Sequence, residues 1–405
     1  MTGSQLMPDA QHAKPTSIDP ADWQVTLTPL QDRRELEHQW RVLEQSSKAS
    51  FFISWDWMGA LLDSAQGIET PQVLRVNASG ELKGIALLWS GHQRRLGLIR
   101  TRSLHLNETG RPEFDRITME HNGILSAAGD EVNVLNSAIK YLAEHPDWDE
   151  CFLSGLDDGL TKQLDEVAPL ERLWHQRRWT KAFHFVDLEA VRNVGGDYLD
   201  SLSSNSRYQA KRAIKGYAAF GPLTCERAAS TSEALTWFED LVRLHQAHWT
   251  AKGEPGAFSS SFTRSFHTTL ITRGWERGNV SILRVMAGPE LLGYLYNFER
   301  NGIASNYQSG HAISESNKLK PGLVIHCLAV QEALKRGLAT YDLLMGGDHF
   351  KPSLCNASGE MSWSKLQQRR LPLGIEMYLR KARDRWHLRS SLRATAQSSN
   401  NENKS

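Results

Sequence analysis

The sequence has few cysteines, no long apolar run and almost no net charge. Its 4 cysteines are scattered among 405 residues without a CxxC pair or a nearby pair of histidines, so no metal or redox motif is expected. No stretch approaches the roughly 18 apolar residues that a membrane-spanning helix needs. Lys plus Arg total 47 and Asp plus Glu 46, which gives no global field to attract nucleic acid. The N-terminus lacks the basic and apolar regions of a signal peptide, so we expect a cytoplasmic protein.

The ends of the chain differ in composition from the middle. Residues 1–21 are polar and contain proline, which predicts a disordered tail. Residues 376–405 are predicted to form a basic helix and tail. The basic stretch 369–393 also contains Trp386 and several leucines, so its helix either packs against the protein with a solvated face or makes a weak peripheral contact with a membrane.

A short internal repeat has an offset of 209 residues. Residues 72–76 match 281–285, and Gly84 corresponds to Gly293. Both copies have the pattern of a strand, a glycine turn and a second strand, which predicts a β-hairpin in each half. We therefore predict a duplicated α/β domain. The predicted parts are an N-terminal domain over 22–190, a linker over 191–206 and a C-terminal domain over 207–375.

The segment from 303 to 351 carries the strongest functional pattern. It predicts a strand (303–310), a tight loop, a helix (322–336), a second strand (340–345) and a glycine turn. The pair Pro321-Gly322 opens the helix, so free backbone N–H groups and the positive end of the helix dipole point out of a strand–helix junction. Such a junction favours an anion, for example a pyrophosphate. No Pro-Gly helix start accompanies the first copy of the repeat, so its domain is expected to lack a donor site.

This segment resembles the acetyltransferases of the GNAT superfamily, and among them the CelD/BcsL-like group. The resemblance rests on 318–323 (KLKPGL), on 341–346 (YDLLMG) and on Phe350-Lys351, and it covers most of residues 35–370. It implies an α/β fold with tandem duplicated GNAT-like acyl-CoA acyltransferase domains, whose mixed, mostly antiparallel sheets are flanked by helices. FemAB-type aminoacyltransferases have the same double layout. The phosphate loop here contains only Gly322, whereas the common GNAT loop is richer in glycine, which leaves aminoacyl-tRNA as an alternative donor.

The resemblance implies acetyl-CoA or another acyl-CoA as co-substrate. The pantetheine arm would lie along 304–310, and the pyrophosphate would meet the start of the following helix. Lysines before the helix would add positive charge. The residues expected to bind the cofactor are Ser309, Lys318, Lys320, Gly322, Leu323 and Val324.

Four residues are candidates for catalysis. Strand alternation would place Ser305, Tyr307 and Ser309 on one face, where Tyr307 protonates the departing thiolate or orients the substrate. Asp342 lies between apolar strand residues and is either a general base or part of a buried salt bridge that holds the next turn. Lys351 is a candidate ligand for a carboxylate or a phosphate. Asp348, beside His349, is either a turn residue or the base.

The resemblance thus predicts direct acyl transfer in a ternary complex to an amine, less often to a hydroxyl. The acceptor would be a small molecule or a sugar-linked amine, in exopolysaccharide or cell-envelope metabolism. Two alternatives stay open: a FemAB-like aminoacyltransferase that uses aminoacyl-tRNA, and a non-catalytic scaffold of polysaccharide synthesis.

Overall fold

The computed structural model describes residues 23–95, 99–313, 316, 318–346, 350–370 and 373–374. The predicted tails over 1–21 and 376–405 lie outside these ranges, as do Asp348 and His349.

The N-terminal half alternates strands with helices. It contains β1 (Trp23–Pro29), α1 (Arg33–Gln45), the 3-10 turn η2 (Phe51–Ile53), α2 (Trp55–Ser64), β2 (Gln72–Ala78), β3 (Glu81–Arg95), β4 (Ile99–Leu106), η3 (Asp115–Ile117), β5 (Leu125–Ser126), α3 (Glu131–Glu144), β6 (Glu150–Asp157), α4 (Asp158–Leu170) and β7 (Leu173–Asp187).

The C-terminal half starts with short helices in the predicted linker. It contains α5 (Leu188–Asn193), α6 (Tyr198–Ser201), α7 (Ser204–Ala218), β8 (Leu223–Arg227), α8 (Thr231–Ala251), α9 (Ser261–Gly274), β9 (Val280–Ala287), β10 (Glu290–Arg300), β11 (Ile303–His311), α10 (Pro321–Lys335), β12 (Thr340–Met345), η4 (Lys351–Leu354) and β13 (Ala357–Gln368). The strands and the helix predicted between 281 and 345 are confirmed to within one residue.

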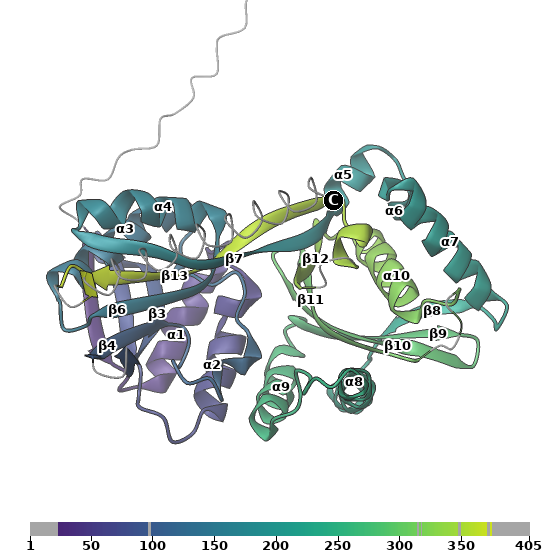
Figure 1. Ribbon diagram of the computed structural model, residues 1–405, viewed down its shortest axis with the longest axis horizontal. Helices are drawn as coiled ribbons and strands as arrows, with labels where there is room; N and C mark the ends of the chain where they lie inside the picture. The colour runs from purple at the N-terminus through teal and green to yellow at the C-terminus, as the bar shows by residue number, and fades with distance from the viewer. Residues whose placement is uncertain are drawn as a thin grey trace, which may run out of the picture.

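One mixed sheet runs through both halves (Figure 1). Its main path is β1-β2-β3-β4-β6-β13-β7-β12-β11-β10-β9-β8. β4 runs parallel to β6, and β11 runs parallel to β12, while the other neighbours on this path are antiparallel. The predicted mixed, mostly antiparallel strands are confirmed, and β7 and β13 join the strands of the two halves into one sheet. The division into domains at 190 and 206 stays a prediction.

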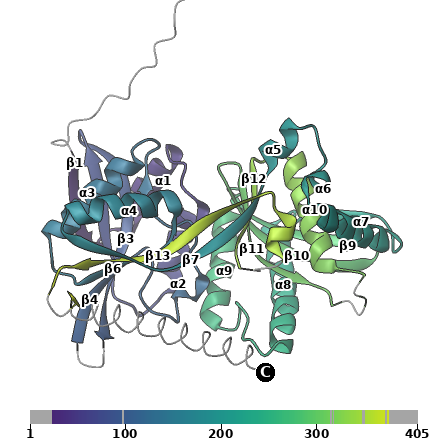
Figure 2. The same cartoon turned by 45° about the horizontal axis from the view of Figure 1, so that its top comes forward.

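The joint is an exchange of strands. β7 follows β6 in the chain but pairs with β12, and β13 follows β12 but pairs with β6. The two long strands also pair with each other along most of their length, and Figure 2 shows them crossing between the halves. This pairing fixes the position of the N-terminal half relative to β12 through backbone hydrogen bonds, which are insensitive to side-chain identity.

The internal repeat is confirmed as two hairpins with the same register. In the first, Val76 pairs with Gly84, and in the second, Val285 pairs with Gly293. Each hairpin continues into a strand, a helix and a parallel strand: β4, α3 and β6 in one half, and β11, α10 and β12 in the other. The two halves therefore share a topology.

Helices cover both faces of the sheet and bury the apolar faces of its strands. In the C-terminal half, α7 and α10 pack on one face, and α8 and α9 pack on the other. The cluster beneath α8 and α9 also contains aromatic residues from η2 and α2, so one core spans the two halves. Phe51 stacks on Phe298 with ring centroids 4.3 Å apart, and Trp57 meets Phe266 edge-on at 4.9 Å.

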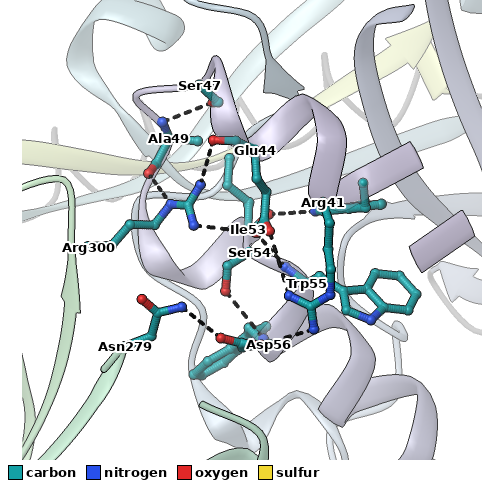
Figure 3. A network of polar contacts seen from close by, with 12 residues as sticks. Arg41, Glu44, Ser47, Ala49, Ile53, Ser54, Trp55, Asp56, Asn279 and Arg300 are labelled. Atoms are coloured by element: carbon teal, nitrogen blue, oxygen red, sulfur yellow. Dashed lines mark hydrogen bonds and ion pairs between the residues drawn. The ribbon is translucent and has the colours of Figure 1, made fainter. Parts of the chain in front are cut away.

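A polar network closes the same junction (Figure 3). Arg300 of β10 donates to the carbonyl oxygens of Glu44 and Ala49 at 3.1 and 3.2 Å, and its guanidinium lies 3.5 Å from the Glu44 carboxylate. Buried Asp56 accepts hydrogen bonds from Arg277 and, at 2.8 Å, from Asn279. These charges are paired across the two halves, which is the condition under which buried charges are tolerated.

Candidate active site

The candidate site begins where two parallel strands separate. β11 pairs with β12 only at Ile303–Thr340, Ala304–Tyr341 and Ser305–Asp342, and beyond that point β11 pairs only with β10. A cavity of about 810 Å³ lies where the strands diverge. Residues 306–311 line one side, Leu344, Met345 and Gly346 line another, and the start of α10 closes an end. This volume is ordinary for a cofactor site.

A β-bulge in β11 changes which side chains face the cavity. Tyr296 pairs with Gln308 and Asn297 with Asn306, so Tyr307 is the extra residue. Tyr307 packs against the cluster beneath α8 and α9, whereas Ser309 pairs with Leu295, which belongs to the cluster under α10. The prediction that Ser305, Tyr307 and Ser309 share one face is therefore wrong, because the bulge shifts the alternation. Both Tyr307 and Ser309 still line the cavity.

The first turn of α10 supplies backbone donors to the cavity. Gly322 and Leu323 occupy the second and third helical positions, whose N–H groups have no intrahelical acceptor, and both residues line the cavity. A Cβ atom on Gly322 would lie 3.2 Å from the His311 ring, so glycine keeps this corner open. The expectation for Val324 is wrong, because its N–H donates to the Lys320 carbonyl at 3.1 Å inside the helix and its side chain is fully buried.

The two predicted lysines differ in position. Lys320 lines the cavity, and its Nζ donates to Gln209 Oε1 of α7 at 2.6 Å. Lys318 is exposed and does not line the cavity. The helix α7 also carries basic side chains, but Arg207 and Lys211 pair with Asp200, at 3.4 and 3.3 Å, rather than facing the cavity.

The rim of the cavity combines cations with aromatic rings. Lys252, the C-cap of α8, lies over the ring of Trp249 in the last turn of that helix, at 5.3 Å. Trp179 and Lys181 of β7 stand on the rim as well, and Trp179 is 42% exposed. Such a rim suits a ligand that carries both negative charge and flat rings, as a nucleotide does.

Asp342 is held by a histidine from the other half. His121 Nε2 lies 2.9 Å from Asp342 Oδ2, and His121 Nδ1 lies 2.7 Å from Asp157 Oδ1. Burial lowers the pKa of His121, but the hydrogen bonds to both aspartates outweigh burial and raise the pKa well above its ordinary value. The other oxygen of Asp342 accepts from the Leu344 N–H at 2.7 Å, where Leu344 has a φ of 59°. Of the two roles open to Asp342, the geometry matches the buried ion pair that holds the following turn.

Lys351 serves the same turn. Its Nζ donates to the carbonyl oxygen of Leu343, which the bulge in β12 leaves without a strand partner on β7, and to that of Met345, which pairs with Phe183 of β7. Burial lowers the pKa of Lys351, and the nearby Glu120 and Asp342 carboxylates oppose that effect. Lys351 lines the cavity and is bound to backbone carbonyls rather than to a carboxylate. Asp348 and His349, predicted for this loop, lie outside the described residues.

Glu120 is the titratable group that the sequence reasoning missed. It is 6% exposed, lines the cavity beside Tyr307 and Lys351, and accepts a hydrogen bond from the Met345 N–H at 2.9 Å. Burial raises its pKa to about 7, and the nearby Asp342 adds to this while Met345, Lys351 and His121 oppose it. A carboxylate with a pKa near neutrality can accept a proton during catalysis. Its only signal in the sequence is the run Glu120-His121-Asn122 after the apolar Ile117 and Met119.

Tyr307 is fixed by the same loop. Its hydroxyl donates to the carbonyl oxygen of Ile117, and burial raises the pKa of the phenol, with the Glu120 charge adding to this. The loop after η3 therefore places Glu120 and holds Tyr307 at the point where β11 and β12 separate.

A known family matches part of the C-terminal half. Residues 204–352 match the family model described as "Acetyltransferase (GNAT) domain". The predicted GNAT-like fold is thereby confirmed, with the strand, helix and strand around the cavity inside the matched range. No curated protein matches the chain.

Three solved structures share the fold across most of the chain. FemX superposes with a TM-score of 0.55 at 11% identity, covering 86% of this chain and 98% of the other. A conserved protein of unknown function from Bacteroides thetaiotaomicron gives 0.52 at 8% identity, covering 85% and 100%. L-PGS from Bacillus licheniformis gives 0.50 at 10% identity, covering 87% and 98%. The two-halved architecture of this chain is thus a known one.

Two further findings concern membrane-spanning helices and metal-binding groups. No helix within the described ranges is long and apolar enough to cross a membrane. Among those same residues, no group of three His, Cys, Asp or Glu side chains is placed to hold a metal ion.

Proposed function

We propose that this protein transfers an acyl group from acyl-CoA to an amine, with the donor in the cavity between β11 and β12. The observation that carries the proposal is the pairing of two features in one cavity. Gly322 and Leu323, whose N–H groups have no intrahelical acceptor, line it, and Glu120, with its raised pKa, lines it as well. The match of residues 204–352 to the GNAT acetyltransferase domain supports the choice of acyl-CoA.

The donor would use three parts of the cavity. Its pyrophosphate would meet the first turn of α10, where the dipole favours an anion, with Lys320 close by. Its pantetheine arm would follow residues 306–311 of β11, which lack a strand partner on that side. Its base would reach the rim formed by Trp249 and Lys252.

The chemistry requires a neutral amine beside the thioester. The amine nitrogen attacks the thioester carbonyl carbon, the carbon–sulfur bond breaks, and the products are an amide and the CoA thiol. Glu120 is assigned as the base that takes the proton from the amine, and Tyr307 lies within the same cavity wall as the group that orients the thioester. Asp342 and Lys351 act as positioning residues, because their polar atoms hold the β12 turn.

Calorimetry with acetyl-CoA tests the donor site. Gly322→Glu places a carboxylate where the pyrophosphate would bind, yet an acidic residue in the first turn suits the helix, so folding is preserved. Gly159→Glu is the matched control, because Gly159 occupies the second position of α4 and has open space around it. We expect Gly322→Glu to abolish binding and the control to bind as the wild type does. Failure of the wild type to bind any acyl-CoA would refute the donor assignment.

The second candidate is transfer from aminoacyl-tRNA. The fold shared with FemX and the lysines on the rim, Lys181 and Lys252, favour testing it. Release of free thiol from acetyl-CoA and transfer of a labelled amino acid from charged tRNA separate the two donors directly. A chain that does neither fits the scaffold alternative. The CelD/BcsL-like grouping, the envelope role and the cytoplasmic location remain proposals that these assays do not address.

A further inference from the structure

A second cavity lies on the other side of the His121–Asp342 pair. Its volume is about 300 Å³, and it is lined by both halves of the chain. Glu120 lines the donor cavity, while the next residue, His121, lines this one together with Asp342 and Asp157. The loop after η3 therefore contributes adjacent residues to two chambers, with Glu120 in one and His121 in the other.

The walls of this second chamber are mainly apolar. Aliphatic side chains come from the edge of β5, from α3, from β6 and from α4, and aromatic rings come from η2 and β10. The apolar lining includes Ile124, Leu153, Leu156, Leu160, Phe298 and Ile303. The aliphatic and aromatic part of these walls offers no hydrogen-bond partner to a hydroxyl group, so a hydrocarbon body suits it better than a sugar ring.

The polar end of the chamber carries an excess of negative charge. Asp157 and Asp342 flank one histidine, and the raised pKa of His121 favours its protonated form, so two carboxyl groups face a single imidazole at this end. Two cations also line the chamber, but Arg300 is paired with Glu44 and Lys48 is exposed at the edge. A cationic head group is therefore favoured at the end that faces the catalytic groups.

We propose that this chamber binds the acceptor, and that the acceptor is a small primary amine with an apolar body. The amine would lie beside the His121–Asp342 pair, and the hydrocarbon body would fill the space between Ile124, Leu160 and Phe298. The idea rests on the proposed function, because it names the acceptor for that reaction. It replaces the sugar-linked amine suggested by the sequence with an amine that has few hydroxyl groups. The cavity volume is at the lower end for ligand sites, which fits a small molecule.

A series of amines tests the proposal, with acetyl-CoA as donor and release of free thiol as the measurement. Each buried methylene contributes about a fourfold gain, so hexylamine should exceed ethylamine in kcat/KM by on the order of 100-fold. Glucosamine should react no better than ethylamine. A preference for glucosamine, or equal rates for ethylamine and hexylamine, would overturn the proposal.

Filling the chamber gives an independent test. Ile124 is half-buried on the wall, so Ile124→Trp should lower kcat/KM for hexylamine at least tenfold while changing the affinity for acetyl-CoA less than twofold. Ile68→Trp is the matched control, because Ile68 is also a half-buried isoleucine but lies in neither chamber. Leu160→Phe, on another wall, serves as a second variant if Ile124→Trp does not fold. If filling the chamber changes the preference among acetyl-, butyryl- and octanoyl-CoA but not among amines, the chamber holds the acyl chain and the proposal is wrong.

Calorimetry with hexylamine alone distinguishes failure of this idea from failure of the proposed function. Binding that Ile124→Trp removes would support the chamber as an amine site even if acyl-CoA proved not to be the donor. Absence of hexylamine binding in a protein that does acetylate other amines would refute the inference and leave the proposed function intact.

Discussion

Replacing Glu120 by glutamine should impair catalysis and stabilise the fold at the same time. Glutamine keeps an oxygen that can accept the hydrogen bond from the Met345 N–H, which measures 2.9 Å in the native protein. It removes the titratable group from a site where burial raises the pKa to about 7. The variant therefore isolates the charge with little change in shape.

The size of the stabilisation follows from proton linkage. The pKa of Glu120 rises from an ordinary 4.5 to about 7 on folding, and a difference of about 2.5 pKa units corresponds to about 3 kcal/mol. Between these values the unfolded chain has lost the proton while the folded chain keeps it, so native stability falls as pH rises through this window. Glutamine does not titrate, so the free energy of unfolding of the variant should match the wild type near pH 4. At pH 8 it should exceed the wild type by up to about 3 kcal/mol.

Urea unfolding at several pH values measures the stability, and thiol release measures the activity. The wild-type kcat/KM should rise with pH and level off above about 7, because the base must be ionised. In Glu120→Gln it should fall by about 100-fold or more. Glu290→Gln, at an exposed glutamate, should change stability by less than about 0.5 kcal/mol and leave activity unaffected. A Glu120→Gln variant that is less stable than the wild type at pH 8, or that keeps its activity, would refute the assignment.

Two further predictions concern the joint between the halves and the repeated glycine. Arg300→Met should lower the free energy of unfolding by about 1–3 kcal/mol at pH 8, because Glu44 then keeps only the Trp55 N–H and Arg41 as partners, and by less as the pH falls, since the raised pKa of Glu44 favours its protonated form. Arg243→Met, in an exposed ion pair, should cost less than about 1 kcal/mol in the same urea titrations, and an equal cost at both arginines would contradict this. Gly293→Ala should destabilise by about 2–3 kcal/mol and weaken acetyl-CoA binding, because its Cβ would lie 2.5 Å from a backbone oxygen of β11. Gly84→Ala, whose Cβ meets the movable side chain of Val134 at 2.4 Å, should cost about half as much, and a larger loss there would show that the two glycines are not used alike.

Local sequence signals made the strands and the helix around the proposed donor cavity predictable. Pro321-Gly322 marks the start of α10, Gly337 with a φ of 79° follows its end, and alternating apolar residues mark the strands around it. The 209-residue repeat became two hairpins with equivalent registers because the turn chemistry that sets each hairpin is encoded within a few residues. These features depend on short stretches of chain, which periodicity and turn residues describe well.

The surroundings of His121, Asp342 and Tyr307 were not predictable in the same way. The hydrogen bond between His121 and Asp342 joins residues 221 positions apart, and no periodic pattern links them. The bulge at Tyr307 reverses the side-chain alternation that a regular strand implies, so the faces of Tyr307 and Ser309 were assigned together when they differ. The sequence predicts a helix start at Gly322 and hence a free N–H at Val324, whereas α10 begins at Pro321 and the Val324 N–H makes the first bond of the helix, to the Lys320 carbonyl.

The strand exchange explains why the chemistry needs both halves. The donor cavity is built by β11, β12 and α10, yet Glu120 comes from the loop after η3, and its carboxylate is aligned by a backbone N–H of β12. The pairing of β13 with β6 and of β7 with β12 sets that alignment. Sheet hydrogen bonds therefore hold both the half that carries Glu120 and the strand β12 that carries its N–H partner. The first half has the same strand–helix–strand order as the second but no Pro-Gly helix start, and in the proposed reaction it contributes Glu120 and the apolar chamber. In the proposed reaction the donor and the acceptor occupy the two chambers that border Glu120 and His121, and direct transfer in a ternary complex requires the amine and the thioester to come together beside Glu120.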